Sequence, residues 1–115
     1  MTDETNQLFA FQSLDIYVAA RELAALVHRS AIADAELRDQ ATRASKSAFL
    51  CICEGLPNER PAMRRKYFTE ANNSLHETVG AVDLAHAIGA LAPEPASRAQ
   101  ALALRVKRML RGLMR

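Results

Sequence analysis

Two groups of basic residues have the type and spacing that best suit a chemical task, the binding of phosphate. The groups are Arg60, Arg64, Arg65 and Lys66, and then Arg105, Lys107, Arg108 and Arg111 in a stretch, 96–115, that holds no acidic residue. Cations at the start of a helix oppose the helix dipole, so the first group does not serve helix stability. Together the groups predict a surface that binds RNA or DNA. The alternative is that they form a solvated face.

A second constellation is Asp83-x-x-His86, with His76 earlier in the same predicted helix. Its acid-x-x-His spacing is that of di-iron helical bundles, which need two such motifs and two further glutamates on facing helices. This chain holds one motif, with Asp in place of Glu. We therefore expect no metal, no cofactor and no catalytic residues. An enzyme or metal protein that uses these three side chains stays as a third hypothesis.

Four other polar residues predict a structural network. Ser74 and Glu77 stand three residues apart, on one face of a helix that also carries apolar residues. A buried carboxylate needs a partner, so we expect an ion pair between Glu77 and Arg43. Glu54 ends a predicted helix, where the dipole disfavours an acid, so it also requires a partner, either Arg43 or Arg60. The alternative is that Arg43, Glu54, Ser74 and Glu77 lie at a subunit interface.

The cysteines and the first residues bear on the compartment. Cys51 and Cys53 are about 200° apart around a helix, so they cannot bridge each other. We expect small buried thiols and a reducing cytoplasm. Residues 1–12 contain two acids and show no signal peptide. No stretch approaches the roughly 20 apolar residues of a membrane span.

The elements that position these residues are four helices. A chain of 115 residues fits one domain. Residues 1–12 form a polar, flexible segment, and residues 13–115 form the bundle. The predicted helices run from an N-cap at Ser13 to about Ala31, from Asp34 to Glu54, from Pro61 to about Gly89, and from about Ala96 onward. Short connections predict an all-α bundle of up-down-up-down topology.

Glycine and proline mark the expected breaks between helices. Gly55 is expected to stop the second helix in a left-handed conformation. Gly80 lies inside the third helix and costs about 1 kcal/mol relative to alanine unless a partner packs closely there. Pro93-Glu94-Pro95 is expected to break the chain before the fourth helix.

The order of motifs resembles a known family of small bacterial bundles, the 23S ribosomal RNA intervening-sequence proteins. Its opening Phe-x-x-Leu-x-x-Tyr pattern is seen at Phe11, Leu14 and Tyr17. Further matches in the second and third helices are Gln40, Arg43, Ala44, Glu54, Gly55, Tyr67, Phe68, Ala71, Ser74, Leu75 and Glu77. Cys51 replaces the usual Asn of the family. The resemblance covers roughly residues 11–91.

The resemblance implies a left-handed four-helix bundle, often assembled as a homopentameric ring, with no known enzymatic activity. Related bundles act as accessory proteins of diversity-generating retroelements, in which a basic surface engages nucleic acid. We therefore expect a cytoplasmic, non-enzymatic homo-oligomer that acts as a scaffold or binding module. The alternative is a nucleic-acid-binding accessory protein that uses the two basic groups.

Overall fold

The computed structural model describes residues 9–115 and shows an all-α fold. Its four helices are α1 (Asp15–Arg29), α2 (Ala35–Gly55), α3 (Pro61–Ala87) and α4 (Pro93–Leu113), preceded by a short 3-10 helix, η2 (Ala10–Ser13). Residues 1–8 of the predicted flexible segment lie outside the described residues. The four-helix prediction is confirmed.

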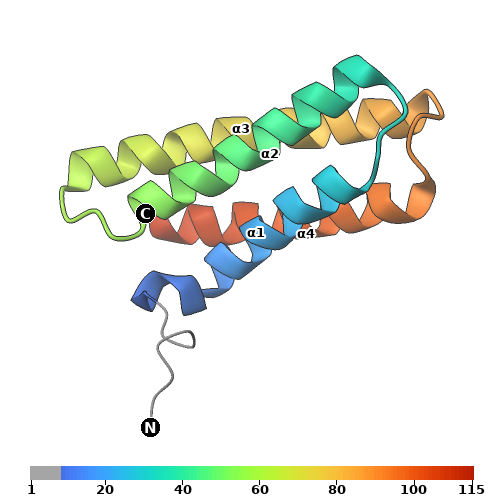
Figure 1. The fold of residues 1–115 in the computed structure, drawn as a ribbon. Coiled ribbons are helices and arrows are strands. Elements are labelled where there is room, and N and C mark those ends of the chain that lie inside the picture. Colours follow the sequence, from blue (N-terminus) through green and yellow to red (C-terminus); the bar gives the residue numbers. More distant parts are fainter. Residues whose placement is uncertain (1–8) are drawn as a thin grey trace, which may run out of the picture.

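The helices alternate in direction and pack as two antiparallel pairs, α2 with α3 and α1 with α4 (Figure 1). α1 also packs against α2, and α3 against α4. One end of the bundle therefore gathers the start of α1, the end of α2, the start of α3 and the end of α4. At the other end, the backbone N–H of Ala33 donates to the carbonyl of Ala90 at 2.9 Å, which ties the α1–α2 loop to the α3–α4 loop. The left-handed sense of the bundle stays a prediction.

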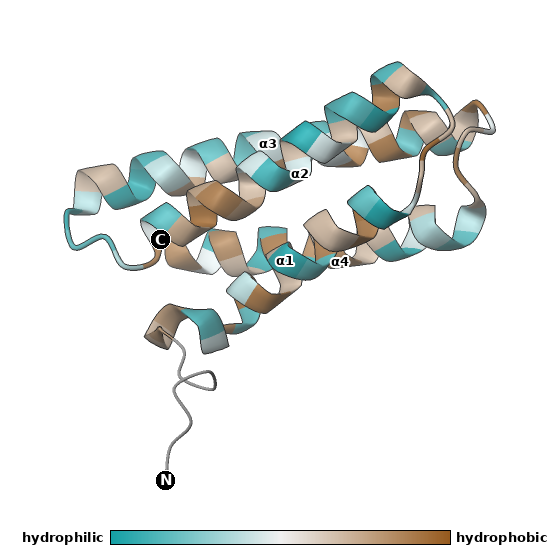
Figure 2. Ribbon diagram, viewed as in Figure 1, coloured by the Kyte–Doolittle hydropathy of each residue, from teal (hydrophilic) through white to brown (hydrophobic). Residues whose placement is uncertain are grey.

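The core combines many alanines with a few large side chains. Apolar residues of all four helices turn inward, and the outer faces are mostly polar (Figure 2). The largest fully buried side chains include Phe68, Leu23 and Ile52. Small residues let neighbouring helices approach closely, so burial is achieved with only six aromatic residues in the whole chain.

Gly55 shows how close this approach is. It is the last residue of α2, and only Ala31 and Gly89 have positive φ among the described residues. The predicted left-handed stop at Gly55 is therefore wrong. A Cβ atom at Gly55 would lie 2.6 Å from Cε1 of Phe68, so the glycine is needed for packing. Gly80, by contrast, has open space around it.

Some of the predicted helix caps and helix starts agree with the structure, and others do not. Asp34 caps α2 as expected, because its Oδ1 accepts the backbone N–H of Leu37 at 2.9 Å. Ser13 does not cap α1: its hydroxyl donates to the Ala10 carbonyl at 3.0 Å and closes η2. α4 begins at Pro93, earlier than predicted, since proline lacks the N–H that the first helical turn leaves unpaired.

Aromatic rings fasten η2 to the bundle. Phe9 stacks on Phe11, with ring centroids 6.0 Å apart. Phe11 meets the edge of Tyr17 at 5.6 Å, and Tyr17 contacts Phe49 of α2 at 5.1 Å. None of the helices within residues 9–115 contains an apolar stretch of the length that a membrane span needs.

Candidate nucleic-acid interface

The start of α3 and the end of α4 bring parts of both basic groups together. A depression of about 200 Å³ lies between these helices, and Arg64, Arg65 and Arg115 line it together with Phe68 and Met114. The sequence separates Arg65 from Arg115 by 50 positions. They meet because α3 and α4 are antiparallel neighbours.

A second depression, of about 300 Å³, continues the first one along α4. It is lined by Asn72, Lys107, Arg111, Met114 and Arg115. Met114 and Arg115 belong to both hollows, so the two adjoin. We call Arg65, Asn72, Lys107, Arg111, Met114 and Arg115 the α3–α4 basic groove.

Arg64 lies beside this groove but serves the fold. Its Nη1 donates to the carbonyls of Leu56 at 2.6 Å and Gly55 at 3.1 Å. Its guanidinium lies over the ring of Phe68, 4.9 Å from the centroid. These carbonyls belong to the end of α2, whose last acceptors need partners. Arg64 therefore links the end of α2 to α3, and we do not include it among the residues expected to bind phosphate.

Lys107 is held at the wall of the groove. Its Nζ lies 2.8 Å from Nε2 of His76 and 3.4 Å from Oδ1 of Asn72. An ammonium group can only donate, so His76 accepts through Nε2 and carries its proton on Nδ1. Both partners are neutral, which leaves the positive charge of Lys107 uncompensated by them.

The other predicted cations point elsewhere. Arg60, Lys66, Arg105 and Arg108 are exposed, yet none lines either hollow of the groove among the described residues. Sequence reasoning left Arg115 and Asn72 out of the site. The sequence did give an indication for Arg115, because this residue belongs to the basic stretch 96–115, which holds no acidic residue.

Glu70 and Glu77 of α3 are turned away from the groove. Oε2 of Glu70 lies 3.9 Å from the sulfur of Cys51, and Oε2 of Glu77 accepts from the Gln40 amide at 3.3 Å. Cys51 and Gln40 both belong to α2, on the far side of α3 from α4. Of the described residues that line the groove, none is acidic. The side chains that line the groove therefore carry positive charge and no negative charge.

The predicted polar network divides into separate contacts. Arg43 and Glu77 do not pair directly: Nη2 of Arg43 donates to Oε1 of Gln40 at 3.1 Å, and Gln40 in turn reaches Glu77. All three side chains lie at the surface of the α2–α3 contact. Ser74 instead meets the Ser47 hydroxyl at 3.0 Å. The expectation of a buried Arg43–Glu77 ion pair is therefore wrong, because a neutral amide stands between them.

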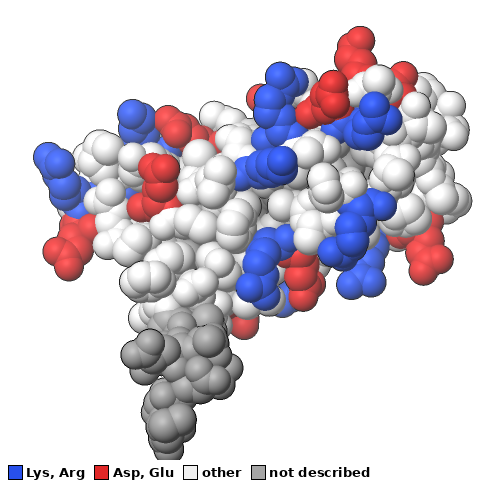
Figure 3. Space-filling model, viewed as in Figure 1, with Lys and Arg blue, Asp and Glu red and all other residues white. Residues whose placement is uncertain are grey.

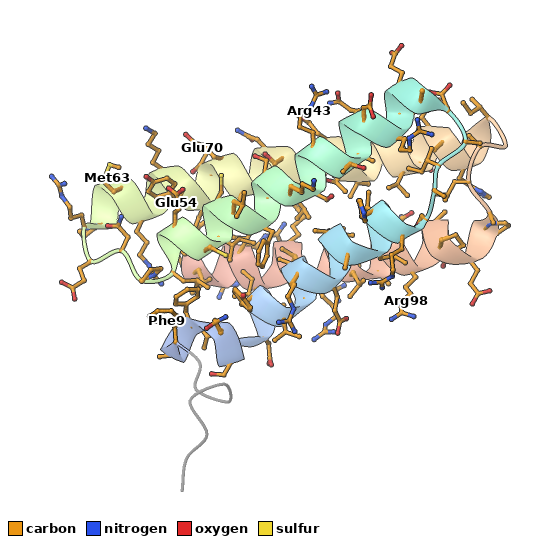
Figure 4. All side chains as sticks on the ribbon, in the orientation of Figure 1. Phe9, Arg43, Glu54, Met63, Glu70 and Arg98 are labelled. Atoms are coloured by element: carbon orange, nitrogen blue, oxygen red, sulfur yellow. The ribbon has the colours of Figure 1, made fainter. Side chains whose placement is uncertain are left out.

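Glu54 finds a partner that the sequence did not suggest. The Glu54 carboxylate raises the pKa of the Tyr67 phenol, first by hydrogen bonding to the neutral form and then by its negative charge. The expected partners were Arg43 and Arg60. Arg43 lies well along α2 from Glu54 (Figure 4).

The cysteines are free thiols, each half-buried on α2. Burial raises the pKa of Cys51, and the negative charges of Glu70 and Glu54 raise it further, against a lowering hydrogen bond with Ser47. Burial also raises the pKa of Cys53. Both thiols are therefore poor nucleophiles at neutral pH, because the thiolate is the reactive form.

The residues of the metal hypothesis are not brought together. His76 contacts Lys107, whereas Nδ1 of His86 lies 3.1 Å from the Leu91 carbonyl. Within residues 9–115, no group of three His, Cys, Asp or Glu side chains is arranged to hold a metal ion.

Comparison with known proteins agrees with the motif order. The family model described as 23S rRNA-intervening sequence protein matches residues 12–112, which is most of the chain. No individual curated protein matches the sequence.

Proposed function

The chain belongs to the 23S rRNA-intervening sequence protein family, and from this premise we propose that it is a non-enzymatic binding protein whose ligand is the phosphodiester backbone of RNA or DNA. The observation that carries the proposal is the α3–α4 basic groove. There, cations that are far apart in the sequence line two adjoining hollows, and none of the described side chains that line them is acidic.

The composition of the groove favours a phosphodiester chain over a compact anion. Arg65, Arg111 and Arg115 are exposed along an elongated hollow, so each guanidinium can donate to a phosphate oxygen. The amide of Asn72 adds a neutral polar contact. Among the described residues that line the two hollows, Phe68 has the one aromatic ring, and this ring is buried, so we expect no base stacking and little sequence preference.

Salt dependence gives a measurable magnitude. Four cations, Arg65, Lys107, Arg111 and Arg115, contact at most four phosphates. On a single strand each phosphate contributes about −0.7 to the slope of log affinity against log salt, which gives a slope of about −3. Affinity then falls about 50-fold between roughly 50 and 200 mM salt.

A matched pair of variants tests the groove by fluorescence anisotropy with a labelled oligouridine. The groove variant replaces Arg65, Arg111 and Arg115 by glutamine. The control replaces Arg98, Arg105 and Arg108, three exposed arginines of α4 that lie outside the groove. Each variant removes three positive charges and changes the formal net charge from +2 to −1.

The groove variant should lose most of its binding, and its salt slope should shrink by about 2 units. The control should bind nearly as the natural chain does. Equal losses in both variants would show that net charge alone attracts the RNA. Absence of binding by the natural chain at low salt would end the proposal.

We also propose that the chain self-associates, with five copies as the number that the family resemblance implies. An apolar hollow of about 350 Å³ at the groove end of the bundle supports this proposal. Its lining includes Leu14, Ile16, Leu56, Met109 and Leu113. Nearby on the same end, Phe9 is 74% exposed and Leu50 is 56% exposed. Apolar surface of this kind marks contacts with other proteins.

Light scattering at several concentrations tests self-association. We expect a mass several times the 12.7 kDa of one chain, reduced by Leu14→Gln. Leu104→Gln is the matched control, because Leu104 and Leu14 are 47% and 45% exposed. A mass of one chain at every concentration refutes self-association, and dissociation by Leu104→Gln alone places the contact elsewhere.

We place the protein in the cytoplasm. The two free thiols, half-buried and too far apart around α2 to bridge, suit a reducing compartment. Fractionation of cells with an antibody to the chain tests this placement.

A further inference from the structure

We propose that a depression on the outer face of α2 is a second site for phosphodiester backbone, so that one chain can hold two nucleic-acid segments. The depression has a volume of about 490 Å³. Its lining residues are His28, Arg38, Asp39, Thr42, Arg43 and Lys46, which we call the α2 basic depression. This inference rests on the proposed function for its ligand, but it concerns different residues.

Helical spacing places these side chains together. Arg38, Thr42 and Lys46 recur every four residues, and Arg43 follows one position after Thr42. Residues three and four apart are neighbours on a helix surface, so the set covers one outward face of α2. Arg38, Arg43 and Lys46 are exposed, and Figure 3 shows several basic side chains on the face formed by α1 and α2.

The positive charge of the depression is only partly compensated. Asp39 is its one acidic lining residue, against the permanent charges of Arg38, Arg43 and Lys46. Nη1 of Arg38 donates to the Ile32 carbonyl at 3.2 Å. Nη2 of Arg43 donates to Oε1 of Gln40, which is also a neutral oxygen.

Bonds of this kind orient the guanidinium groups without neutralising them. Each guanidinium has five N–H donors, and one donor is used in each of these contacts. The remaining donors can reach phosphate oxygens at the surface. The hydroxyl of Thr42 is a further donor within the depression.

The two basic sites are separated in space. The depression lies on α2, with His28 near the end of α1, whereas the groove lies between the start of α3 and the end of α4. The α1–α2 loop and the start of α3 are at opposite ends of the bundle (Figure 1), so the depression lies toward one end and the groove toward the other. No cation belongs to both sites, so two bound segments would not compete for the same side chains.

The number of oligonucleotides bound per chain tests the inference. Isothermal titration calorimetry at low salt, with an oligouridine short enough to fill one site, should give two per natural chain. Arg43→Gln with Lys46→Gln should give one, and so should the groove triple variant. Combining all five substitutions should abolish binding. Circular dichroism of each variant checks that the fold is retained.

A matched control replaces Arg29 and Arg98, two exposed arginines outside both sites, and should still bind two. One oligonucleotide per natural chain, unaffected by Arg43→Gln and Lys46→Gln, overturns the second site and leaves the proposed function standing. Loss of one site in that double variant, with no effect of the groove triple, refutes the groove and supports the depression. Equal binding of polyglutamate at the depression overturns the assignment of a phosphodiester ligand.

Discussion

Gly55→Ala is expected to destabilise the bundle, although alanine is the better helix former. A Cβ at this position would lie 2.6 Å from Cε1, 2.8 Å from Cδ1 and 3.2 Å from Cζ of Phe68. The ring is 1% exposed and therefore has little room to move. Overpacking of a core costs about 1–3 kcal/mol. Helix propensity returns about 1 kcal/mol, so we expect a net loss of about 0–2 kcal/mol.

Gly80→Ala supplies the matched control, because it makes the same substitution inside α3 with nothing within 4 Å of the new Cβ. There we expect a gain of about 0.5–1 kcal/mol. Urea denaturation at one fixed chain concentration measures both, since self-association would make stability depend on concentration. The predicted difference between the two variants is therefore about 1–3 kcal/mol.

The close approach of Gly55 to Phe68 also predicts that substitutions at the two positions are energetically coupled. In a Phe68→Leu background the ring is gone, so Gly55→Ala should no longer destabilise and should approach the effect at Gly80. A double-mutant cycle measures this coupling. If Gly55→Ala stabilises the natural chain as much as Gly80→Ala does, the close-packing argument is refuted.

Four further predictions concern single residues. Arg64→Met should lower the free energy of unfolding by about 2 kcal/mol, through loss of charged hydrogen bonds to the end of α2, whereas Arg65→Met should change it little; urea denaturation compares them. Asp34→Ala should cost about 1 kcal/mol through loss of the α2 cap, seen as a lower Tm, and an unchanged Tm would contradict that role. Ala31→Gly should stabilise the fold by about 0.5–1 kcal/mol, because Ala31 has φ of 49°, and a loss of stability would show that its methyl group matters more. In a Cys53→Ser background, Cys51 should react slowly with iodoacetamide at neutral pH and faster only at pH above the usual thiol range, because burial and then Glu70 raise its pKa. Glu70→Gln should shift the rise in reaction rate to lower pH, and an unchanged pH profile would show that Glu70 does not raise this pKa.

Local sequence signals predicted the helices well because their causes are local. The cap at Asp34 depends on a bond three residues away, and proline restrains the first turn of α3 wherever it occurs. Ser13 failed for a reason of the same range. Its hydroxyl donates to the Ala10 carbonyl and does not cap α1. Serine side chains commonly form such local bonds to the backbone in place of a helix cap.

The site was harder to predict, because its causes are tertiary. Arg64 and Arg65 are adjacent in the sequence but point about 100° apart on α3. Only the packing of α2 shows which one meets Gly55 and Leu56. A clue existed, since Arg64 precedes the core residue Phe68 by four positions. The groove likewise required knowledge that α4 ends beside the start of α3.

The hydrogen bond between Ala33 and Ala90 links two loops at the end of the bundle away from the α3–α4 basic groove. It joins the two loops that connect the α1–α4 pair to the α2–α3 pair, so the α1–α2 loop cannot separate from the α3–α4 loop without breaking it. Exchange of the Ala33 amide with deuterated water therefore reports on the opening of both loops together. At the opposite end, the helices can fray without disturbing this link. Opening at that end requires the bonds from Arg64 to the Gly55 and Leu56 carbonyls to break, so amide exchange at the two ends reports on different links.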